Sequence, residues 1–288
     1  MKIISFMLLK RSFFYFRGKM EKIVSSTEIA PRIHKIVITA PQIAKMWQPG
    51  QFLILHVKED SERIPLTICK RDPEKGEITL VVQAIGESTR EICSMPAGSP
   101  IRDVLGPLGM PSEIDVNFKN VLFVSGGIGI TPLYPLIQKY YELGSRTTVL
   151  MGFRTAKNLI LEEEVREVAT NTMIASDDGT LGEKGLALDL IAPAIEKWGK
   201  FDHVYIAGPV RMMQYTVAEA AKFGIKSTVS LNPLMIDGTG MCGGCRVNIG
   251  GHVKFACVDG PEFDGELVDF EKLAKKLGTY KDHQCRIR

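Results

Sequence analysis

The sequence predicts an antiparallel β-barrel, then a doubly wound α/β domain with a parallel sheet, and finally a small segment that binds a metal cluster. Short apolar runs separated by turn residues fill the first part of the chain, as in small barrels. From Asn120 onward, strand patterns alternate with helical patterns, which is typical of a parallel sheet covered by helices. Near the C-terminus, three of the 6 cysteines lie close together in glycine-rich sequence.

Composition limits the classes of function. The 288 residues suffice for two domains with an appendage, and 45% hydrophobic and 24% charged residues are ordinary for a globular protein. A net charge of +3, spread along the chain, does not indicate a nucleic-acid partner. Clustered cysteines without a disulfide framework suit a reducing compartment, so we expect a cytoplasmic protein.

The N-terminal residues differ in character from the rest of the chain. An apolar run that ends at Leu9 is followed by Lys10 and Arg11, so it is too short to span a bilayer. It also lacks the small-residue cleavage site of a signal peptide. We interpret 1–19 as an N-terminal extension and Met20 as the true start, and we expect no transmembrane segment and no membrane partner.

The barrel is assigned to 20–118. One helix is expected at 89–94, and Pro, Gly and Asp residues mark the turns. The six runs expected to form strands are 22–26, 34–39, 51–57, 66–71, 78–84 and 101–104.

The α/β domain is assigned to 119–231. A buried strand at 121–125 leads through a glycine-rich loop into a helix, with Thr131 expected as its N-cap, Pro132 at its first position and Gly144 at its end. Further strands are expected at 147–151, 172–175, 203–207 and 226–230, and further helices at 159–169, 186–197 and 210–223. The remaining segment, 232–288, carries the clustered cysteines and a closing helix at 268–277.

The cysteine cluster has the spacing of an iron–sulfur site. Asp237, Cys242, Cys245 and Cys257 follow the plant-type [2Fe–2S] pattern C-x4-C-x2-C…C, with aspartate in the first position. The surrounding glycines allow the loop to turn its backbone N–H groups toward the sulfurs. A zinc site and plain loop cysteines are the alternatives, but zinc sites usually pair two Cys/His elements and His252 is the only local histidine.

The other cysteines carry no such pattern. Cys69 and Cys93 lie in apolar contexts and are expected to be buried thiols, and we assign no role to Cys285.

Two strand-to-helix turns are candidates for binding a dinucleotide. The loop Gly126–Pro132 would turn N–H groups and a helix N-terminus toward a pyrophosphate, although it is not the G-x-G-x-x-G fingerprint and could simply pack tightly. The turn Ala207-Gly208-Pro209 occupies the same kind of position later in the chain. Because open α/β sheets bind ligands at the carboxyl ends of their strands, the two turns could flank one dinucleotide.

A third loop affects whether NAD(H) or NADP(H) is expected to bind. Asp177 and Asp178 follow an expected strand and could accept hydrogen bonds from a ribose, or simply form a solvated turn. Their charges would repel a 2′-phosphate, so we expect NAD(H) rather than NADP(H). Arg154 and Lys157 lie near enough in sequence to keep NADP(H) open.

The barrel holds two further candidates. Arg63-Ile-Pro65-Leu-Thr67 starts a strand, where the Thr67 amide or hydroxyl could hydrogen-bond a flavin ring and a guanidinium could meet phosphate. The run from Gly86 through Ser88 and Thr89 joins a strand to a helix and offers further donors. Each, taken alone, could be an ordinary turn.

In this order, Arg-x-Pro-x-Thr, Gly-x-Ser-Thr, Gly-Gly-x-Gly-x-Thr-Pro and Ala-Gly-Pro, the motifs resemble the ferredoxin–NADP reductase superfamily. With the C-terminal cluster added, the chain from Met20 onward is similar to the iron–sulfur flavoprotein electron-transfer subunits. That family includes the small subunit of NADH-dependent ferredoxin:NADP oxidoreductase, the electron-transfer subunit of dihydroorotate dehydrogenase, and sulfide dehydrogenase homologues. The flavin motif and the aspartate favour the first of these over the second, whose usual site has four cysteines.

The resemblance implies a role for each motif residue. FAD would be bound by Arg63, Pro65, Leu66, Thr67, Val81, Val82, Gln83, Gly86, Ser88 and Thr89. The nicotinamide dinucleotide would be bound by Gly126, Gly127, Gly129, Thr131, Asp177, Asp178, Ala207, Gly208 and Pro209. The [2Fe–2S] cluster would be held by Asp237, Cys242, Cys245 and Cys257.

Three positions depart from the family pattern. Ile64 stands where many members have the flavin-motif arginine, so the contact of Arg63 is open. Ala207 replaces a frequent cysteine, which removes any thiol beside the nicotinamide. Asp237 replaces the first cysteine; it is expected to be a ligand, the alternative being a loop residue with water or a partner's group completing the cluster.

The implied function is electron transfer. NAD(P)H would deliver a hydride to FAD, and single electrons would leave through the cluster to a larger partner subunit that contains flavin and iron–sulfur groups, in a heterodimer or larger assembly. The cofactors carry this chemistry, so no catalytic side chain is expected. A non-enzymatic, cluster-based redox sensor is the alternative from another class.

Overall fold

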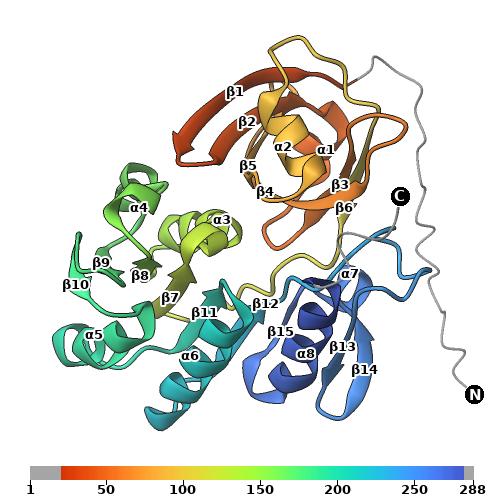
Figure 1. The fold of residues 1–288 in the computed structure, drawn as a ribbon. Helices are drawn as coiled ribbons and strands as arrows, with labels where there is room; N and C mark the ends of the chain where they lie inside the picture. The colour runs from red at the N-terminus through yellow and green to blue at the C-terminus, as the bar shows by residue number, and fades with distance from the viewer. Residues whose placement is uncertain (1–20, 282–288) are drawn as a thin grey trace, which may run out of the picture.

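The computed structural model describes residues 21–281, which fold into a barrel, an α/β domain and a small C-terminal segment beside both (Figure 1). This arrangement confirms the predicted fold class. The extension 1–19, the start at Met20 and Cys285 lie outside the described residues.

The barrel is one antiparallel sheet in the order β1-β2-β5-β4-β3-β6. Its strands are β1 (Ile23–Ala30), β2 (Ile33–Thr39), β3 (Phe52–His56), β4 (Arg63–Asp72), β5 (Glu77–Gln83) and β6 (Asp103–Leu108). Backbone hydrogen bonds from Ile23 and Ile101 join the start of β1 to the segment before β6, which brings the two edges together. All six predicted strands are present, and the predicted helix is α2 (Glu87–Ser94). The short helix α1 (Pro41–Met46) was missed because its proline suggested a turn.

The α/β sheet has the order β10-β9-β8-β7-β11-β12-β15. Its parallel strands are β7 (Asn120–Gly126), β8 (Arg146–Phe153), β9 (Asn171–Ser176), β10 (Glu183–Lys184), β11 (His203–Ala207) and β12 (Ser227–Ser230). The order reverses between β7 and β11, where ligands of such sheets bind. The last strand, β15 (Glu262–Asp264), comes from the C-terminal segment and pairs antiparallel with β12, an addition that three residues were too few to predict.

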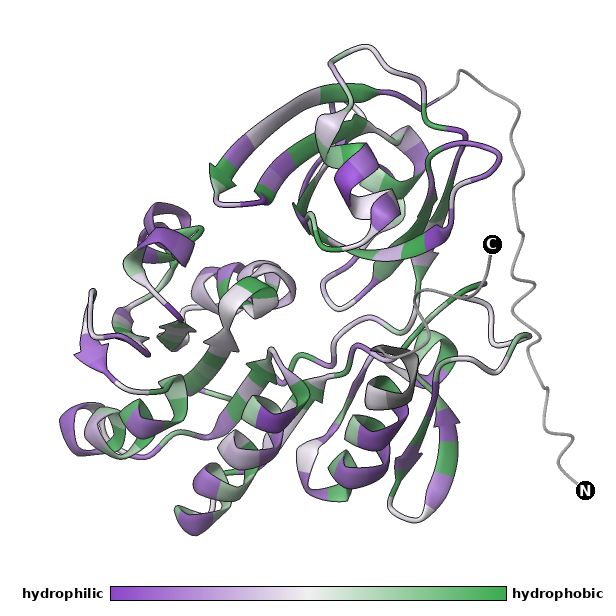
Figure 2. Cartoon of the chain, viewed as in Figure 1, coloured by the Kyte–Doolittle hydropathy of each residue, from purple (hydrophilic) through white to green (hydrophobic). Residues whose placement is uncertain are grey.

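Helices cover both faces of this sheet, which explains why its strands are apolar throughout. Val121 and Phe123 pack with α3 (Ile130–Glu142) and α4 (Glu162–Val168). Leu122 and Val124 pack with α5 (Ile191–Trp198) and α6 (Val210–Lys222). Figure 2 shows the apolar central strands between helices whose outer faces are polar.

The start of α3 differs from the prediction. A single 3-10 turn, η1 (Gly127–Gly129), precedes the helix, and Gly129 rather than Thr131 is the N-cap. Thr131 lies inside the first turn of α3 and is buried. The glycine-rich loop therefore enters the helix earlier than the Thr-Pro pair suggested.

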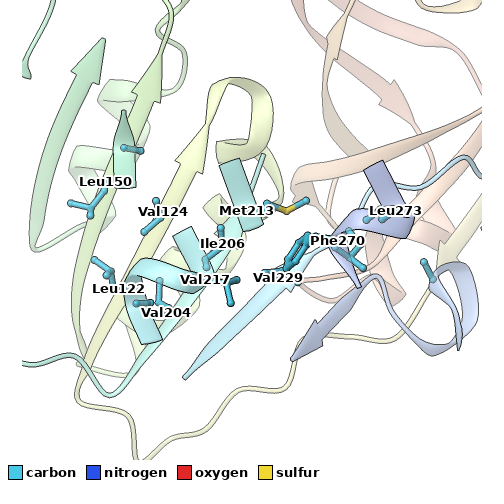
Figure 3. Packing of buried hydrophobic residues seen from close by; sticks show 14 of the residues in the cluster. Leu122, Val124, Leu150, Val204, Ile206, Met213, Val217, Val229, Phe270 and Leu273 are labelled. Carbon is cyan, nitrogen blue, oxygen red and sulfur yellow. The ribbon is translucent and has the colours of Figure 1, made fainter. Parts of the chain in front are cut away.

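The C-terminal segment is held against the α/β domain by apolar packing. It contains the hairpin β13 (Arg246–Ile249) and β14 (His252–Phe255), then α7 (Ala256–Asp259) and α8 (Phe270–Lys281). Phe270 and Leu273 of α8 belong to the same core as Met213 and Val217 of α6 (Figure 3). Within residues 21–281, no helix is long and apolar enough to cross a membrane.

The barrel contacts the other face of the α/β domain. Ala30, Ile33, Cys69 and Val81 join the core that contains α3. The ammonium of Lys70 lies 4.8 Å from the ring centroid of Tyr134, and Lys35 forms a 3.6 Å ion pair with Glu164. Cys69 and Cys93 are buried, as predicted, and burial raises their thiol pKa values to about 12 and about 11.

A half-buried carboxylate, that of Glu262, joins the domain linker to β15. The Ser112 hydroxyl donates to Oε1 of Glu262 at 2.9 Å, and the Met110 N–H donates to the Gly260 carbonyl at 2.7 Å. Burial, together with the nearby charge of Glu113, raises the pKa of Glu262 from 4.5 to about 7. Between these two values the folded protein binds more protons here than the unfolded chain, so this group makes stability fall as pH rises.

We therefore expect Glu262→Gln to be more stable than the wild type above pH 7 and to lose this advantage toward pH 4.5. Each pKa unit corresponds to about 1.4 kcal/mol, so apparent Tm values should differ by a few degrees. Thermal unfolding across this pH range is the measurement, with the exposed Glu266→Gln as the control. Equal pH dependence in both variants and the wild type would contradict the assignment.

Candidate functional site

The two predicted dinucleotide turns meet at the switch point of the sheet. Ser125 at the end of β7 lies opposite Ala207 at the end of β11. The approach is so close that a Cβ on Gly129 would collide with the Ala207 carbonyl, and a Cβ on Gly208 would lie 3.0 Å from the Gly126 nitrogen. Pro209 is the N-cap of α6 and directs that helix away from the same edge. The glycines are thus required by geometry.

The loop leaves room and polar groups for a ligand. Gly127 has φ +55°, and an added Cβ there would meet no atom within 4 Å. The Thr131 hydroxyl is buried and has no hydrogen-bond partner among the described residues. An unpaired buried hydroxyl is costly unless something binds it. An open glycine turn, a helix N-terminus and this hydroxyl fit a phosphate-bearing ligand.

Asp177 and Asp178 lie at the same edge of the sheet but two strands away from Gly126, after β9. Both are exposed. Asp178 accepts hydrogen bonds from the Thr180 hydroxyl at 2.6 Å and the Thr180 N–H at 3.0 Å, which lower its pKa. Asp178 is therefore engaged in its own turn, whereas no hydrogen bond of the described chain uses the Asp177 carboxylate.

The predicted flavin residues of the barrel occupy neighbouring strands. Arg63, Pro65, Leu66 and Thr67 form the first half of β4, and all are exposed or half-buried. Val81, Val82 and Gln83 end β5, the strand that pairs with the second half of β4. Val82 points into the barrel core and Val81 packs toward α3, so neither side chain lies free on the surface.

The start of α2 contains the third predicted group. Gly86 is the N-cap, and the Thr89 hydroxyl accepts hydrogen bonds from the N–H groups of Gly86 (2.8 Å) and Ile85 (3.1 Å). Thr89 therefore orders the turn itself. Ser88 is buried and, with Lys58 and Ser61 of the loop that precedes Arg63, lines a cavity of about 360 Å³. The carboxylates of Asp60, Glu62, Glu87 and Glu91 also line this cavity. Because these charges would repel a phosphate group, we do not assign the cavity to the cofactor.

Of the three predicted cysteine ligands, Cys242 and Cys245 lie in the glycine-rich loop and Cys257 lies in the short helix α7. The sulfurs of Cys245 and Cys257 are 3.1 Å apart, and both residues are buried. Cys242 is exposed, and its sulfur accepts a 3.4 Å hydrogen bond from the Gly244 N–H. Burial and the contact with Cys245 raise the pKa of the Cys257 thiol to about 12. A metal must displace that proton when it binds.

Asp237 lies beside Cys242. Its carboxylate accepts hydrogen bonds from the Cys242 N–H, the Thr239 N–H (2.7 Å) and the Thr239 hydroxyl (3.3 Å). Burial would raise the Asp237 pKa, but these hydrogen bonds outweigh it and the pKa is lowered. A carboxylate has about four acceptor positions, so one remains for a metal.

No three His, Cys, Asp or Glu side chains within 21–281 surround one common point, as a mononuclear zinc site would require. The neighbours fall into two pairs instead: the sulfurs of Cys245 and Cys257 are in contact, and the Asp237 carboxylate accepts the backbone N–H of Cys242. A binuclear cluster takes two ligands on each iron. The donor set therefore fits [2Fe–2S] better than zinc.

The barrel and α7 support this loop. Gly238 has φ +72°, and a Cβ there would lie 2.6 Å from Leu108 and 2.8 Å from Ile54. On the other side, a Cβ on Gly240 would lie 2.8 Å from Val258, one residue after Cys257. The glycines that the sequence suggested for turning N–H groups also permit close contact with both neighbours.

Sequence reasoning missed two residues here. Lys276 of α8 donates to the carbonyl oxygens of Gly244 (2.6 Å) and Arg246 (3.1 Å), on either side of Cys245. Met212 places its sulfur beneath both nucleotide turns, where a Cβ on Gly126 or Gly208 would meet it at 3.1 or 2.8 Å. A lysine in a charged helix and one of two adjacent methionines carry no signal that could have identified them.

Two family descriptions match the chain. Residues 232–269 match the iron–sulfur cluster binding domain of dihydroorotate dehydrogenase B. Residues 123–218 match the oxidoreductase NAD-binding domain. These regions contain the predicted cluster ligands and both nucleotide turns.

Similar proteins cover nearly the whole chain. The dihydroorotate dehydrogenase B (NAD(+)) electron transfer subunit homolog of Thermotoga maritima is 42% identical over 265 residues, 92% of this chain and 93% of its own length. A dihydroorotate dehydrogenase B (NAD(+)) electron transfer subunit of Bacillus cereus is 36% identical over 258 residues, 85% of this chain and 96% of its own length.

A solved structure agrees with these relatives. A chain of an NADH-dependent reduced ferredoxin–NADP oxidoreductase superposes with a TM-score of 0.87 at 42% identity, covering 93% of this chain and 96% of that one. The matches confirm the predicted resemblance and the cofactor set of FAD, [2Fe–2S] and NAD(H). The chain belongs to the family of dihydroorotate dehydrogenase B-type electron-transfer subunits, within the ferredoxin–NADP reductase superfamily.

Proposed function

We propose that this protein is the small subunit of an NADH-dependent ferredoxin:NADP oxidoreductase. The observation that carries the proposal is the aspartate-and-three-cysteine loop, packed against both the flavin-type barrel and the dinucleotide-type sheet. The 42% identity and full-length superposition with a chain of such an enzyme support it. We retain 20–118, 119–231 and 232–288 as its functional division and a reducing cytoplasm as its location.

When bound, FAD and NAD(H) supply the hydride chemistry and the [2Fe–2S] cluster supplies single-electron transfer. The protein chain would hold these groups in position. The N–H groups around Gly127 and the Thr131 hydroxyl would bind the dinucleotide phosphates, and Ala207-Gly208-Pro209 would border the nicotinamide. The remaining predicted FAD and ribose contacts, including Arg63 and Asp177, keep the roles that the resemblance implies.

The cluster ligands are proposed as two pairs. Cys245 and Cys257, buried and in sulfur–sulfur contact, would hold the inner iron. Asp237 and Cys242 would hold the outer iron, since Cys242 is exposed and Asp237 accepts its N–H. In this pairing the exposed Cys242 would be the ligand nearest the surface, where electrons would leave.

An apolar rim around Cys242 supports a partner subunit. Met241 is 90% exposed, Ile236 50% and Leu234 38%. Soluble proteins seldom expose adjoining apolar side chains without an interaction to cover them. We assign this rim to a larger oxidoreductase subunit containing flavin and iron–sulfur groups, which would receive the electrons.

The electron-transfer subunit of a dihydroorotate dehydrogenase is the second candidate. It is favoured by the description of the family that matches residues 232–269 and by the names of the relatives. The two candidates share every step within this chain and differ in the partner. Purification from the native host decides between them: a glutamate synthase-like flavoprotein supports the first, and a dihydroorotate dehydrogenase barrel supports the second.

Anaerobic NADH should bleach the flavin of the purified protein, whereas a redox sensor that turns over no pyridine nucleotide would keep its absorbance. Gly129→Ala should slow this bleaching by about 10²-fold, because the new Cβ separates the two nucleotide turns. Dithionite should still reduce the variant fully. Gly278→Ala, where a Cβ meets nothing within 4 Å, is the matched control. Normal bleaching of Gly129→Ala would refute the placement of the nucleotide.

Asp237→Cys should retain the cluster with altered EPR g-values or a lower reduction potential, since the donor atom changes from oxygen to sulfur. Asp237→Asn, which keeps an oxygen but loses the charge, should hold the cluster less well. An unchanged spectrum and potential in Asp237→Cys would show that Asp237 is no ligand.

Met241→Asp should weaken binding of the partner subunit by about tenfold or more, the cost of losing one well-packed interface anchor. Leu186→Asp, on the α/β domain and 48% exposed, should bind normally. Dissociation constants from titration of the holo-protein with its partner provide the comparison. Equal affinities for both variants would place the interface elsewhere.

A further inference from the structure

The last helix reaches the cluster loop through one side chain. Lys276 of α8 donates to two carbonyl oxygens, those of Gly244 at 2.6 Å and Arg246 at 3.1 Å. The carbonyl between them, of Cys245, accepts from the Ala256 N–H at 3.2 Å. Three successive carbonyls around Cys245 are therefore fixed, two of them by one ammonium group.

These contacts set the orientation of the loop's peptide groups. The C=O and N–H of a trans peptide point in opposite directions. With the Gly244 carbonyl bound to Lys276, the Cys245 N–H points away from the ammonium. The preceding N–H, of Gly244, donates to the Cys242 sulfur at 3.4 Å. Lys276 thus directs the Gly244 and Arg246 carbonyls toward one side of the loop, whereas the Cys245 N–H points toward the other side.

The position of Lys276 is itself fixed by α8. Leu273 and Phe270, about one and two turns earlier, are buried against α6. Glu271 is hydrogen-bonded by Arg211 and, at 3.0 Å, by Gln214, both of α6. The helix that begins at the nucleotide turn therefore supports the helix that holds the cluster loop.

The ammonium also contributes charge at a half-buried site. Lys276 binds the carbonyls on both sides of Cys245, so its positive charge lies close to that residue. Burial and Arg246 lower the Lys276 pKa, whereas Cys245 and Cys242 raise it. A charge removed from bulk water acts more strongly on its neighbours than an exposed one. A fixed cation beside a redox centre favours its reduced, more negative form.

We propose that Lys276 is a positioning residue for the cluster, which anchors the Cys242–Arg246 loop to α8 and raises the cluster's reduction potential. The inference rests on the proposed function, because it takes Cys242 and Cys245 as cluster ligands. Lys276 itself touches neither the cluster ligands' sulfurs nor a substrate; it acts through the backbone and through its charge.

The test compares four holo-proteins: wild type, Lys276→Gln, Lys276→Arg and Lys272→Gln. Lys272 lies one turn earlier on α8 and pairs with Asp269 at 3.0 Å, so its replacement removes the same charge without touching the loop. The midpoint potential of the cluster is measured by anaerobic titration followed by EPR. The rate of iron loss to a chelator is measured on the oxidised proteins.

Lys276→Gln should have a lower midpoint potential and lose iron about tenfold faster, the effect expected when hydrogen bonds from a charged donor are lost. Lys276→Arg should restore most of the potential, and Lys272→Gln should match the wild type. An effect on iron loss alone, with unchanged potential, would reject the electrostatic role. A Lys276→Gln protein that matches the wild type in both would overturn the inference while leaving the proposed function intact. A wild-type protein without a [2Fe–2S] signal would instead overturn the proposed function.

Discussion

The apolar core between the α/β sheet and α8 is the feature on which the nucleotide turns and the cluster loop depend. Val229 of β12, Met213 and Val217 of α6, and Phe270 and Leu273 of α8 pack together, and Cys245, Cys257 and Ala256 belong to the same core. Ile54 and Leu108 extend it to the barrel. A loop as rich in glycine as 237–245 has little packing of its own, so its conformation is imposed by these neighbours.

This shared core fixes where the proposed nucleotide and cluster sites lie relative to each other. The nucleotide turns lie at the edge of the sheet from which α6 begins, and the cluster loop is wedged between the barrel and α7. Electrons that enter at the nucleotide turns and leave at Cys242 would pass through the flavin site of the barrel. The antiparallel addition of β15 to β12 and the contact between Ser112 and Glu262 keep these parts together.

The cluster segment combines opposite electrostatic effects within a few residues. Asp237 accepts two N–H groups and a hydroxyl from its own loop, while Lys276 donates to carbonyls on the other side of the Cys-Gly-Gly-Cys turn. Both groups orient the backbone of the cluster loop through hydrogen bonds to its N–H and C=O groups. Side-chain hydrogen bonds thus fix the conformation of a loop whose glycine-rich sequence would not fix it alone.

Much of this protein follows from its sequence. Hydrophobic periodicity predicted the six barrel strands and nearly every element of the α/β domain, because burial on one or both faces leaves a repeating pattern. The glycine turns after β7 and β11 could be identified because few residues other than glycine allow such close approaches. The proposed cluster loop could be identified because its cysteine spacing is typical of iron–sulfur ligands. What only the tertiary structure decided depends on contacts between distant segments. Thr131 lies inside α3, and its hydroxyl has no hydrogen-bond partner in the described part of the chain, whereas the hydroxyl of Thr89 is used by its own turn. Strand β15 joins a sheet far from it in sequence, and Lys276 reaches a loop 30 residues away. No local pattern encodes such pairings, because each depends on where the folded core places the other partner.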